Sequence, residues 1–140
     1  MEINYNYETD FSLSSEERYS DWINRVLLSE DFEIGELGYI FCDDNYLLRI
    51  NQKFLGHETL TDIITFDYSE SSTLSGDIFI SVERVRSNAE TYEVSFEEEL
   101  KRVMVHGVLH LMGYKDKQQT EVRKMRDKED EKIKMFHVEH

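Results

Sequence analysis

The sequence predicts an α+β fold, a single domain in which one mixed sheet of about four strands is packed by about five helices. The length of 140 residues suits one domain with a substantial core. The composition, 39% apolar and 33% charged, is typical of a globular protein. The apolar patterns run strand, helix, strand, helix, strand, strand and then helices, an order typical of one mixed sheet. No linker divides residues 1–140, so we expect one domain.

The first three elements are predicted from hydrophobic periodicity. Residues 2–8 alternate between polar and apolar side chains, which is the pattern of a half-buried strand. Ser14 and Glu17 have the spacing of a capping box, and the apolar positions that follow repeat at helical spacing. We therefore expect a helix over about 15–29. A second short strand is expected over about 36–42.

A helix and two strands follow in the middle of the chain. Asp43 or Asp44 can cap the helix, which we expect to end near Gly56. The runs Ile63–Phe66 and Ile78–Ile80 are β-branched or aromatic throughout. Such uninterrupted apolar runs favour buried strands, so both are expected to be central strands of the sheet.

Three helices are expected in the remainder of the chain. Apolar residues at helical spacing predict one over about 82–92. Ser95 with Glu98 forms a second candidate capping box, which begins a helix with a broad apolar face. Residues 118–136 are highly charged but carry a narrow apolar stripe, so we expect a last helix there.

One stretch of the second of these helices has the pattern of a metal site. His106 and His110 are four residues apart, so both rings lie on one helical face and can share a metal ion. Gly113 can take the left-handed conformation that ends a helix. The chain can then turn back so that Asp116 supplies a third ligand. On this interpretation the chain is a metal-dependent hydrolase, with His106, His110 and Asp116 acting in catalysis through the metal.

The alternative is that these are two ordinary histidines at the edge of a core helix. The added glycine and aspartate favour the metal site, because the spacing H-x-x-x-H-x-x-G-x-x-[HD] is that of the metzincin zinc site. Zinc peptidases, however, carry a glutamate base directly after the first histidine. That position is Gly107 here, which disfavours ordinary peptidase chemistry.

Three blocks of the chain resemble the YbeY family of bacterial endoribonucleases. The family signature H-G-x-L-H-L-x-G-Y-D-H is similar to H-G-V-L-H-L-M-G-Y-K-D at residues 106–116. The block N-x-x-Y-R-x-x-D-x-P-T-D-V-L-S-F is similar to residues 51–66, and G-D-I matches residues 76–78. The blocks keep the family order and spacing, so the resemblance covers the chain from about residue 36 to its end.

The resemblance implies an α+β fold with one Zn²⁺ per chain and cleavage of single-stranded RNA. It implies roles in 16S rRNA 3′-end maturation and ribosome quality control, with rRNA and the small ribosomal subunit as partners. The metal ligands carry over to His106, His110 and Asp116. Asp116 stands where the family has its third histidine, and a carboxylate there adds negative charge.

A second departure concerns the family's arginine in the middle block, which is Leu55 here. An arginine can clamp a phosphate and stabilise charge in the transition state, and leucine can do neither. Lys53 and His57 flank this position and are candidate substrate-binding residues. Asp62 and Asp77, which precede the two apolar runs, are interpreted first as structural hydrogen-bonding residues.

Charge and composition limit the classes of function. The net charge of −14 lacks the basic footprint that nucleic-acid binders usually show, which weighs against an RNA substrate. No apolar run exceeds four residues, so we expect no membrane span, and the single cysteine, Cys42, excludes an internal disulfide. We expect a cytoplasmic protein.

The leading hypothesis is therefore a single-strand-specific, zinc-dependent endoribonuclease in rRNA processing. The runner-up is a zinc metallopeptidase-like hydrolase, which the ligand spacing permits. A third hypothesis is a non-catalytic ribosome assembly factor with a structural zinc, which the acidity and Leu55 keep open. The sequence leaves the general base and the oligomeric state open.

Overall fold

The structure, a computed structural model, describes residues 2–57 and 60–137. Along these residues it contains four strands and five α-helices, with two short helical segments. Their bounds are β1 (Glu2–Tyr7), α1 (Glu16–Ser29), β2 (Glu33–Cys42), α2 (Asp44–Ile50), η1 (Asn51–Leu55), β3 (Ile63–Asp67), β4 (Thr73–Ser81), α3 (Val82–Tyr92), α4 (Phe96–Leu111), α5 (Gln119–Lys134) and η2 (Met135–His137). The predicted order of elements and the α+β class are confirmed.

The strands form one sheet in the order β1-β2-β4-β3. Strands β1 and β4 are both parallel to β2, and β3 is antiparallel to β4, so the sheet is mixed as expected. Parallel neighbours need crossover connections, which α1 and the α2–β3 segment provide. The last two strands are joined by a short connection, which is sufficient for an antiparallel pair.

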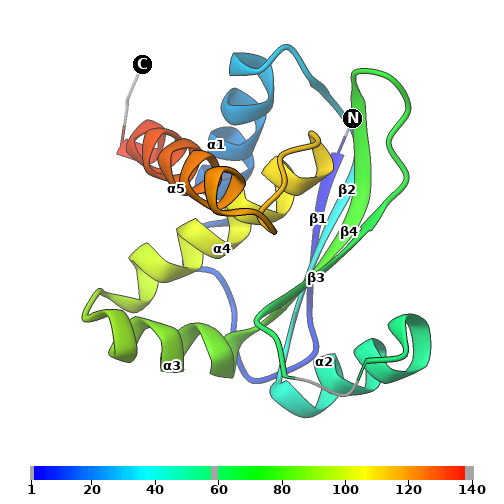
Figure 1. Ribbon diagram of the computed structural model, residues 1–140, viewed down its shortest axis with the longest axis vertical. Coiled ribbons are helices and arrows are strands. Elements are labelled where there is room, and N and C mark those ends of the chain that lie inside the picture. The colour runs from blue at the N-terminus through cyan, green and yellow to red at the C-terminus, as the bar shows by residue number, and fades with distance from the viewer. Residues whose placement is uncertain (1, 58–59, 138–140) are drawn as a thin grey trace.

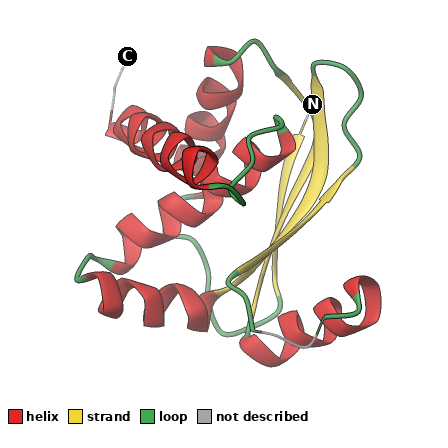
Figure 2. Ribbon diagram, viewed as in Figure 1, coloured by secondary structure: helices red, strands yellow, loops and turns green. Residues whose placement is uncertain are grey.

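The helices are distributed unequally over the two faces of the sheet. Helices α1, α3, α4 and α5 lie on one side, and α2 with η1 lies at one end of the other (Figures 1 and 2). Helix α4 packs against β3 and β4, and α5 packs on α4. The Tyr39 hydroxyl donates to the Met104 carbonyl at 2.9 Å, which joins β2 to the middle of α4. The metal motif therefore lies on a core helix, as predicted.

Strand β3 lies at the edge of the sheet, so the prediction of a central strand is wrong for it and right for β4. The apolar run of β3 has a different cause. Ile64 is buried in a small cluster with Cys42 and Leu47 on the α2 side. Ile63 packs against the main core on the opposite side. A strand covered on both faces needs apolar residues on both, wherever it stands in the sheet.

Two predicted boundaries are also corrected. The N-cap of α1 is Ser15 rather than Ser14, because the Ser15 side chain accepts the hydrogen bond from the Arg18 amide. Strand β2 begins at Glu33, before the expected start near residue 36, and its pairing with β4 shifts register between Ile34 and Leu37. The start near 36 was predicted from Gly35 and Gly38 as flanking residues, but both glycines lie inside the strand, and Gly35 lies in the irregular stretch.

The segment after β2 ends where the sequence predicted. Asp43 caps α2 by accepting from the Tyr46 amide at 2.8 Å. The helix then continues as the π-helical turn η1 and stops at Gly56, whose φ of 67° is left-handed. In the part of the chain that the structure describes, no helix combines the length and hydrophobicity needed to span a membrane.

Candidate metal centre

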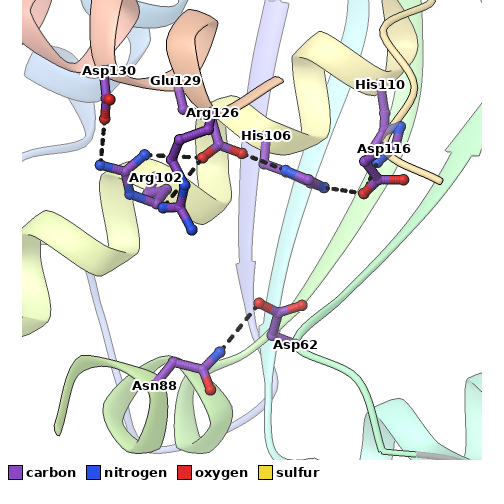
Figure 3. Close-up of polar contacts among 9 residues, drawn as sticks. All are labelled: Asp62, Asn88, Arg102, His106, His110, Asp116, Arg126, Glu129 and Asp130. Carbon is purple, nitrogen blue, oxygen red and sulfur yellow. Dashed lines mark hydrogen bonds and ion pairs between the residues drawn. The ribbon is translucent and has the colours of Figure 1, made fainter. Parts of the chain in front are cut away.

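Three potential ligand atoms converge at the C-terminal end of α4. His106 and His110 lie one turn apart on this helix, and Asp116 lies in the loop that follows it. The Oδ2 atom of Asp116 is 3.3 Å from Nε2 of His106 and 3.2 Å from Nε2 of His110. Figure 3 shows the carboxylate beside both rings. All three side chains are half-buried, and His106 and Asp116 line a cavity.

The loop returns Asp116 to the helix by a local turn at Gly113. This glycine has a φ of 107°, which side chains other than glycine rarely adopt. The Gly113 amide donates to the His110 carbonyl, and the Tyr114 amide donates to that of Leu109, both at 3.0 Å. These bonds close the last turn of α4. The Tyr114 hydroxyl then donates to Glu30 of α1 at 2.7 Å, which anchors the loop.

The arrangement fits a tetrahedral metal ion. Ligands at about 2.0–2.1 Å from a tetrahedral zinc stand roughly 3.3–3.4 Å apart. The two separations from Asp116 Oδ2 match that edge, and the three ligand atoms all lie within 4.8 Å of one another. Two imidazole nitrogens with one carboxylate oxygen form a donor set that suits zinc and related divalent metals.

A buried carboxylate lies behind the first histidine. Glu129 of α5 is 5% exposed, and its Oε2 is 2.6 Å from Nδ1 of His106. Its Oε1 accepts from Arg102 of α4 at 2.9 Å, and Arg102 also donates to Asp130 at 2.7 Å. Burial by itself lowers the pKa of His106, but the Glu129 hydrogen bond and the charges of Glu129 and Asp116 outweigh it and raise the pKa above its usual value.

A cavity of about 240 Å³ opens beside His106 and Asp116. Asp62, which directly precedes β3, lines it and accepts a hydrogen bond from the Asn88 side chain at 3.3 Å. Burial is the main cause that raises the pKa of Asp62, with His106 opposing it. Figure 3 shows the Asp62 carboxylate on the same side of α4 as His106. The structure thus brings a further acidic group to the metal ligands.

The carboxylates that line this cavity outnumber its arginines, four to two. Glu99 in the first turns of α4 is only 4% exposed, and burial together with the charge of Asp62 raises its pKa. The basic residues of the lining are Arg102 and Arg126, and both lie next to Glu129. A metal ion would offset part of this negative charge.

The remaining residues singled out in the sequence lie away from the ligands. Lys53 and His57 are exposed on η1 and the loop after it, and neither lines the cavity. Leu55, at the position of the family's arginine, is 44% exposed and also lies outside the cavity lining. Asp77 lines a separate groove with residues of β1 and β2. Of the two aspartates interpreted as structural, only Asp62 accompanies the metal ligands.

The sequence interpretation missed Glu129 and Arg102 as parts of the site. A signal was present, because Glu129 stands four residues after Met125 on the narrow apolar stripe of the last helix. A carboxylate at a stripe position must be paired in order to be buried. Val122, assigned to the same stripe, is instead 48% exposed.

Comparison with known proteins agrees with this geometry. The family model described as endoribonuclease YbeY matches residues 3–137. A protein named endoribonuclease YbeY from Flavobacterium johnsoniae is 60% identical over 98% of this chain and 99% of its own length. Relatives of the same name in Flavobacterium psychrophilum and Christiangramia forsetii are 60% and 52% identical, over 97% and 99% of this chain.

The fold is also similar to a solved structure. The solution structure of the Thermotoga maritima protein TM1509 matches with a TM-score of 0.68 at 22% identity, over 96% of this chain and 89% of that one. This likeness concerns the fold alone. Because the family model covers nearly the whole chain and relatives of that name share more than half of their residues with it, the chain belongs to the endoribonuclease YbeY family.

Proposed function

We propose that this protein is a zinc-dependent endoribonuclease that cleaves single-stranded RNA in the cytoplasm. Its substrate is rRNA of the small ribosomal subunit, where it acts in 16S rRNA 3′-end maturation and ribosome quality control. Family membership supports the nuclease activity. The observation that carries the metal dependence is the convergence of two Nε2 atoms on Asp116 Oδ2 beside an open cavity.

One Zn²⁺ per chain would be held by His106, His110 and Asp116. Bound there, the ion supplies Lewis acidity for a water molecule and for the scissile phosphate. The protein holds the ligands in place through the helix pitch and the Gly113 turn. The carboxylate of Asp116 adds negative charge where a third histidine would add none. We therefore expect a less acidic bound water and a broader metal preference than in a three-histidine site.

Asp62 is the residue best placed to accept the proton of the attacking water. Its carboxylate lines the same cavity as His106, and the Asn88 amide orients it. Burial raises the pKa of Asp62 above its usual value, which makes the carboxylate a stronger proton acceptor. This assignment replaces the peptidase base that the sequence lacks.

The peptidase alternative loses support from the packing of Gly107. A Cβ atom at this position would stand 2.9 Å from Ile78 and 3.1 Å from Ile63. The position therefore points at the sheet rather than into the cavity. A glutamate base could not be placed there without separating α4 from β3 and β4. The assembly-factor alternative predicts that the protein binds zinc but does not cleave RNA. The experiment below distinguishes it from the nuclease.

The proposed function is tested by metal analysis followed by cleavage assays. Purified wild type should carry about one zinc per chain, and His110→Ala should lose it because one of three ligands is removed. The zinc-loaded protein should cleave single-stranded RNA and leave casein intact. A folded wild type that binds no zinc would contradict the metal site. Zinc binding without RNA cleavage would instead support the hypothesis of a non-catalytic assembly factor.

A further inference from the structure

Glu129 occupies an unusual place for a carboxylate, since it is buried between two helices. Its side chain is 6% exposed, and both of its oxygens are engaged. Oε2 lies 2.6 Å from His106 Nδ1, and Oε1 lies 2.9 Å from Arg102 Nη1 (Figure 3). An ionised carboxylate accepts hydrogen bonds and donates none. The short contact therefore requires the hydrogen to be on Nδ1 of the imidazole.

The hydrogen bond at Nδ1 also determines the state of the other ring nitrogen, Nε2. With the hydrogen on Nδ1, a neutral imidazole keeps its lone pair on Nε2. That atom is the one facing Asp116 Oδ2. We propose that Glu129 is a positioning residue, which fixes His106 with Nδ1 protonated and Nε2 presented to the metal. The inference rests on the proposed metal site and extends it into the last helix.

Glu129 is itself held in place by a pair of charges. Arg102 lies on α4, one turn before His106, and donates to Glu129 and to Asp130 of α5. The Arg102 side chain is 17% exposed, so water competes little for its hydrogen bonds. Arg126, at 3.8 Å from Glu129, adds a second positive charge. These contacts leave the carboxylate little freedom to turn away from the ring.

Carboxylates bonded to a ligating histidine orient the ring and raise its basicity, and their loss usually lowers metal affinity by about 10–100-fold. Glu129 is in the position that this role requires, because it hydrogen-bonds the His106 ring on the side opposite the candidate metal ligands. It is not one of the ligand group itself, which comprises His106, His110 and Asp116 among the described residues. Its hydrogen bond therefore acts on the metal through His106, in addition to the direct effect of its charge.

A purely structural role for Glu129 makes a different prediction. If the residue only helped α5 to pack on α4, its replacement would lower the melting temperature and leave zinc affinity unchanged. The positioning role predicts a loss of affinity that exceeds any loss of stability. It also predicts a defined hydrogen-bonded ring N–H in the wild type, a feature that helix packing alone would not affect.

The test compares wild type, Glu129→Gln and Glu131→Gln. Glu131 is on the same helix, is 55% exposed and pairs with Lys132, so it controls for the loss of one α5 carboxylate. Zinc affinity is measured by competition with a chelator, and stability by thermal melting of the metal-free proteins. Nitrogen-15 NMR of the zinc-loaded proteins reports which ring nitrogen of His106 carries hydrogen and how strongly it is protected from exchange.

We expect Glu129→Gln to lower zinc affinity about tenfold or more and to weaken the protection of the Nδ1 hydrogen, because an amide oxygen is a poorer acceptor than a carboxylate. Glu131→Gln should stay close to wild type. Zinc affinity of Glu129→Gln within twofold of wild type would overturn the inference. So would ligation of zinc through Nδ1 in the wild type, a result that needs no variant to fold. A wild type that binds no zinc would instead contradict the proposed function.

Discussion

The interpretation of Asp62 changes once the fold is known. In the sequence it is an aspartate before an apolar strand, a common place for a structural hydrogen-bonding residue. In the structure it lines the same cavity as His106 and accepts a hydrogen bond from Asn88 of α3. Its position is compatible with a structural role and with a role as the general base, and a kinetic measurement distinguishes the two.

Replacing Asp62 by asparagine should lower the turnover number on single-stranded RNA by about 10²-fold or more, because a general base contributes roughly 10²–10⁴. Zinc content should remain near wild type, since Asp62 is not a ligand. Asp67→Asn, at the exposed end of the same strand, is the matched control. Turnover within threefold of wild type in a folded, zinc-loaded Asp62→Asn protein would rule out the assignment.

The three candidate metal ligands are the part of the site that sequence reasoning identified most completely. His106 and His110 share a helical face because of the helix pitch, and Gly113 ends that helix by its own backbone preference. These are local properties of a short stretch. The structure places the Asp116 carboxylate within 3.3 Å of both rings, and ligation of a metal by the three groups stays a prediction.

At the scale of elements, α5 joins the metal helix and its loop to α1. Lys128 and Lys132 of α5 both pair with Glu30, at 3.0 and 2.8 Å, and Glu30 accepts from Tyr114 as well. The Trp22 indole donates to the Lys132 carbonyl at 2.7 Å, which adds a bond from the core of α1. The charged last helix is thus held by buried polar contacts as much as by its apolar stripe.

This cluster predicts a specific loss of stability in acid. Burial by itself raises the pKa of Glu30, but its hydrogen bonds from Lys132, Tyr114 and Lys128 outweigh it and lower the pKa to about 2 from a usual 4.5. Because the folded-state pKa is the lower one, the stabilisation is present above about pH 4.5. It is lost as the pH falls through 4.5 toward 2.

We therefore expect Glu30→Gln to lower the free energy of unfolding at pH 7 by about 2–3 kcal/mol, which is the roughly 3.4 kcal/mol equivalent of the pKa shift reduced for solvent screening. The difference from wild type should shrink between pH 4.5 and 2. Urea unfolding at several pH values measures it. Asp21→Asn, which removes an exposed carboxylate of α1 that pairs with Arg25, should differ from wild type by less than about 1 kcal/mol. A constant difference across this pH range would contradict the account.

At the scale of the whole molecule, the net charge of −14 must be reconciled with an RNA substrate. The basic groups lining the cavity are Arg102 and Arg126, and both lie next to Glu129. An acidic protein that repels RNA at long range can bind it through a few contacts near the metal. Affinity that depends on few phosphate contacts depends only weakly on salt.

The affinity for single-stranded RNA should fall only about three- to sevenfold when salt rises from about 50 to 200 mM, as expected for one or two phosphate contacts. Fluorescence anisotropy with a labelled oligonucleotide and a cleavage-deficient, zinc-loaded protein measures it. A fall of a hundredfold or more would require about five contacts and hence a basic surface that the composition does not show.

The sequence by itself determined the order of the elements and the α+β class, and it singled out the three candidate metal ligands that the structure places together. These depend on periodicity, capping and residue spacing, which act over a few residues. Only the tertiary structure decided that β3 stands at the edge of the sheet, that Glu129 contacts His106 and that Asp62 lines the same cavity as His106. Those contacts join segments 23 or more residues apart, and they depend on which faces bury one another. No local sequence pattern encodes which faces bury one another. An edge strand that is covered on both faces, for example, has the same apolar pattern as a central strand.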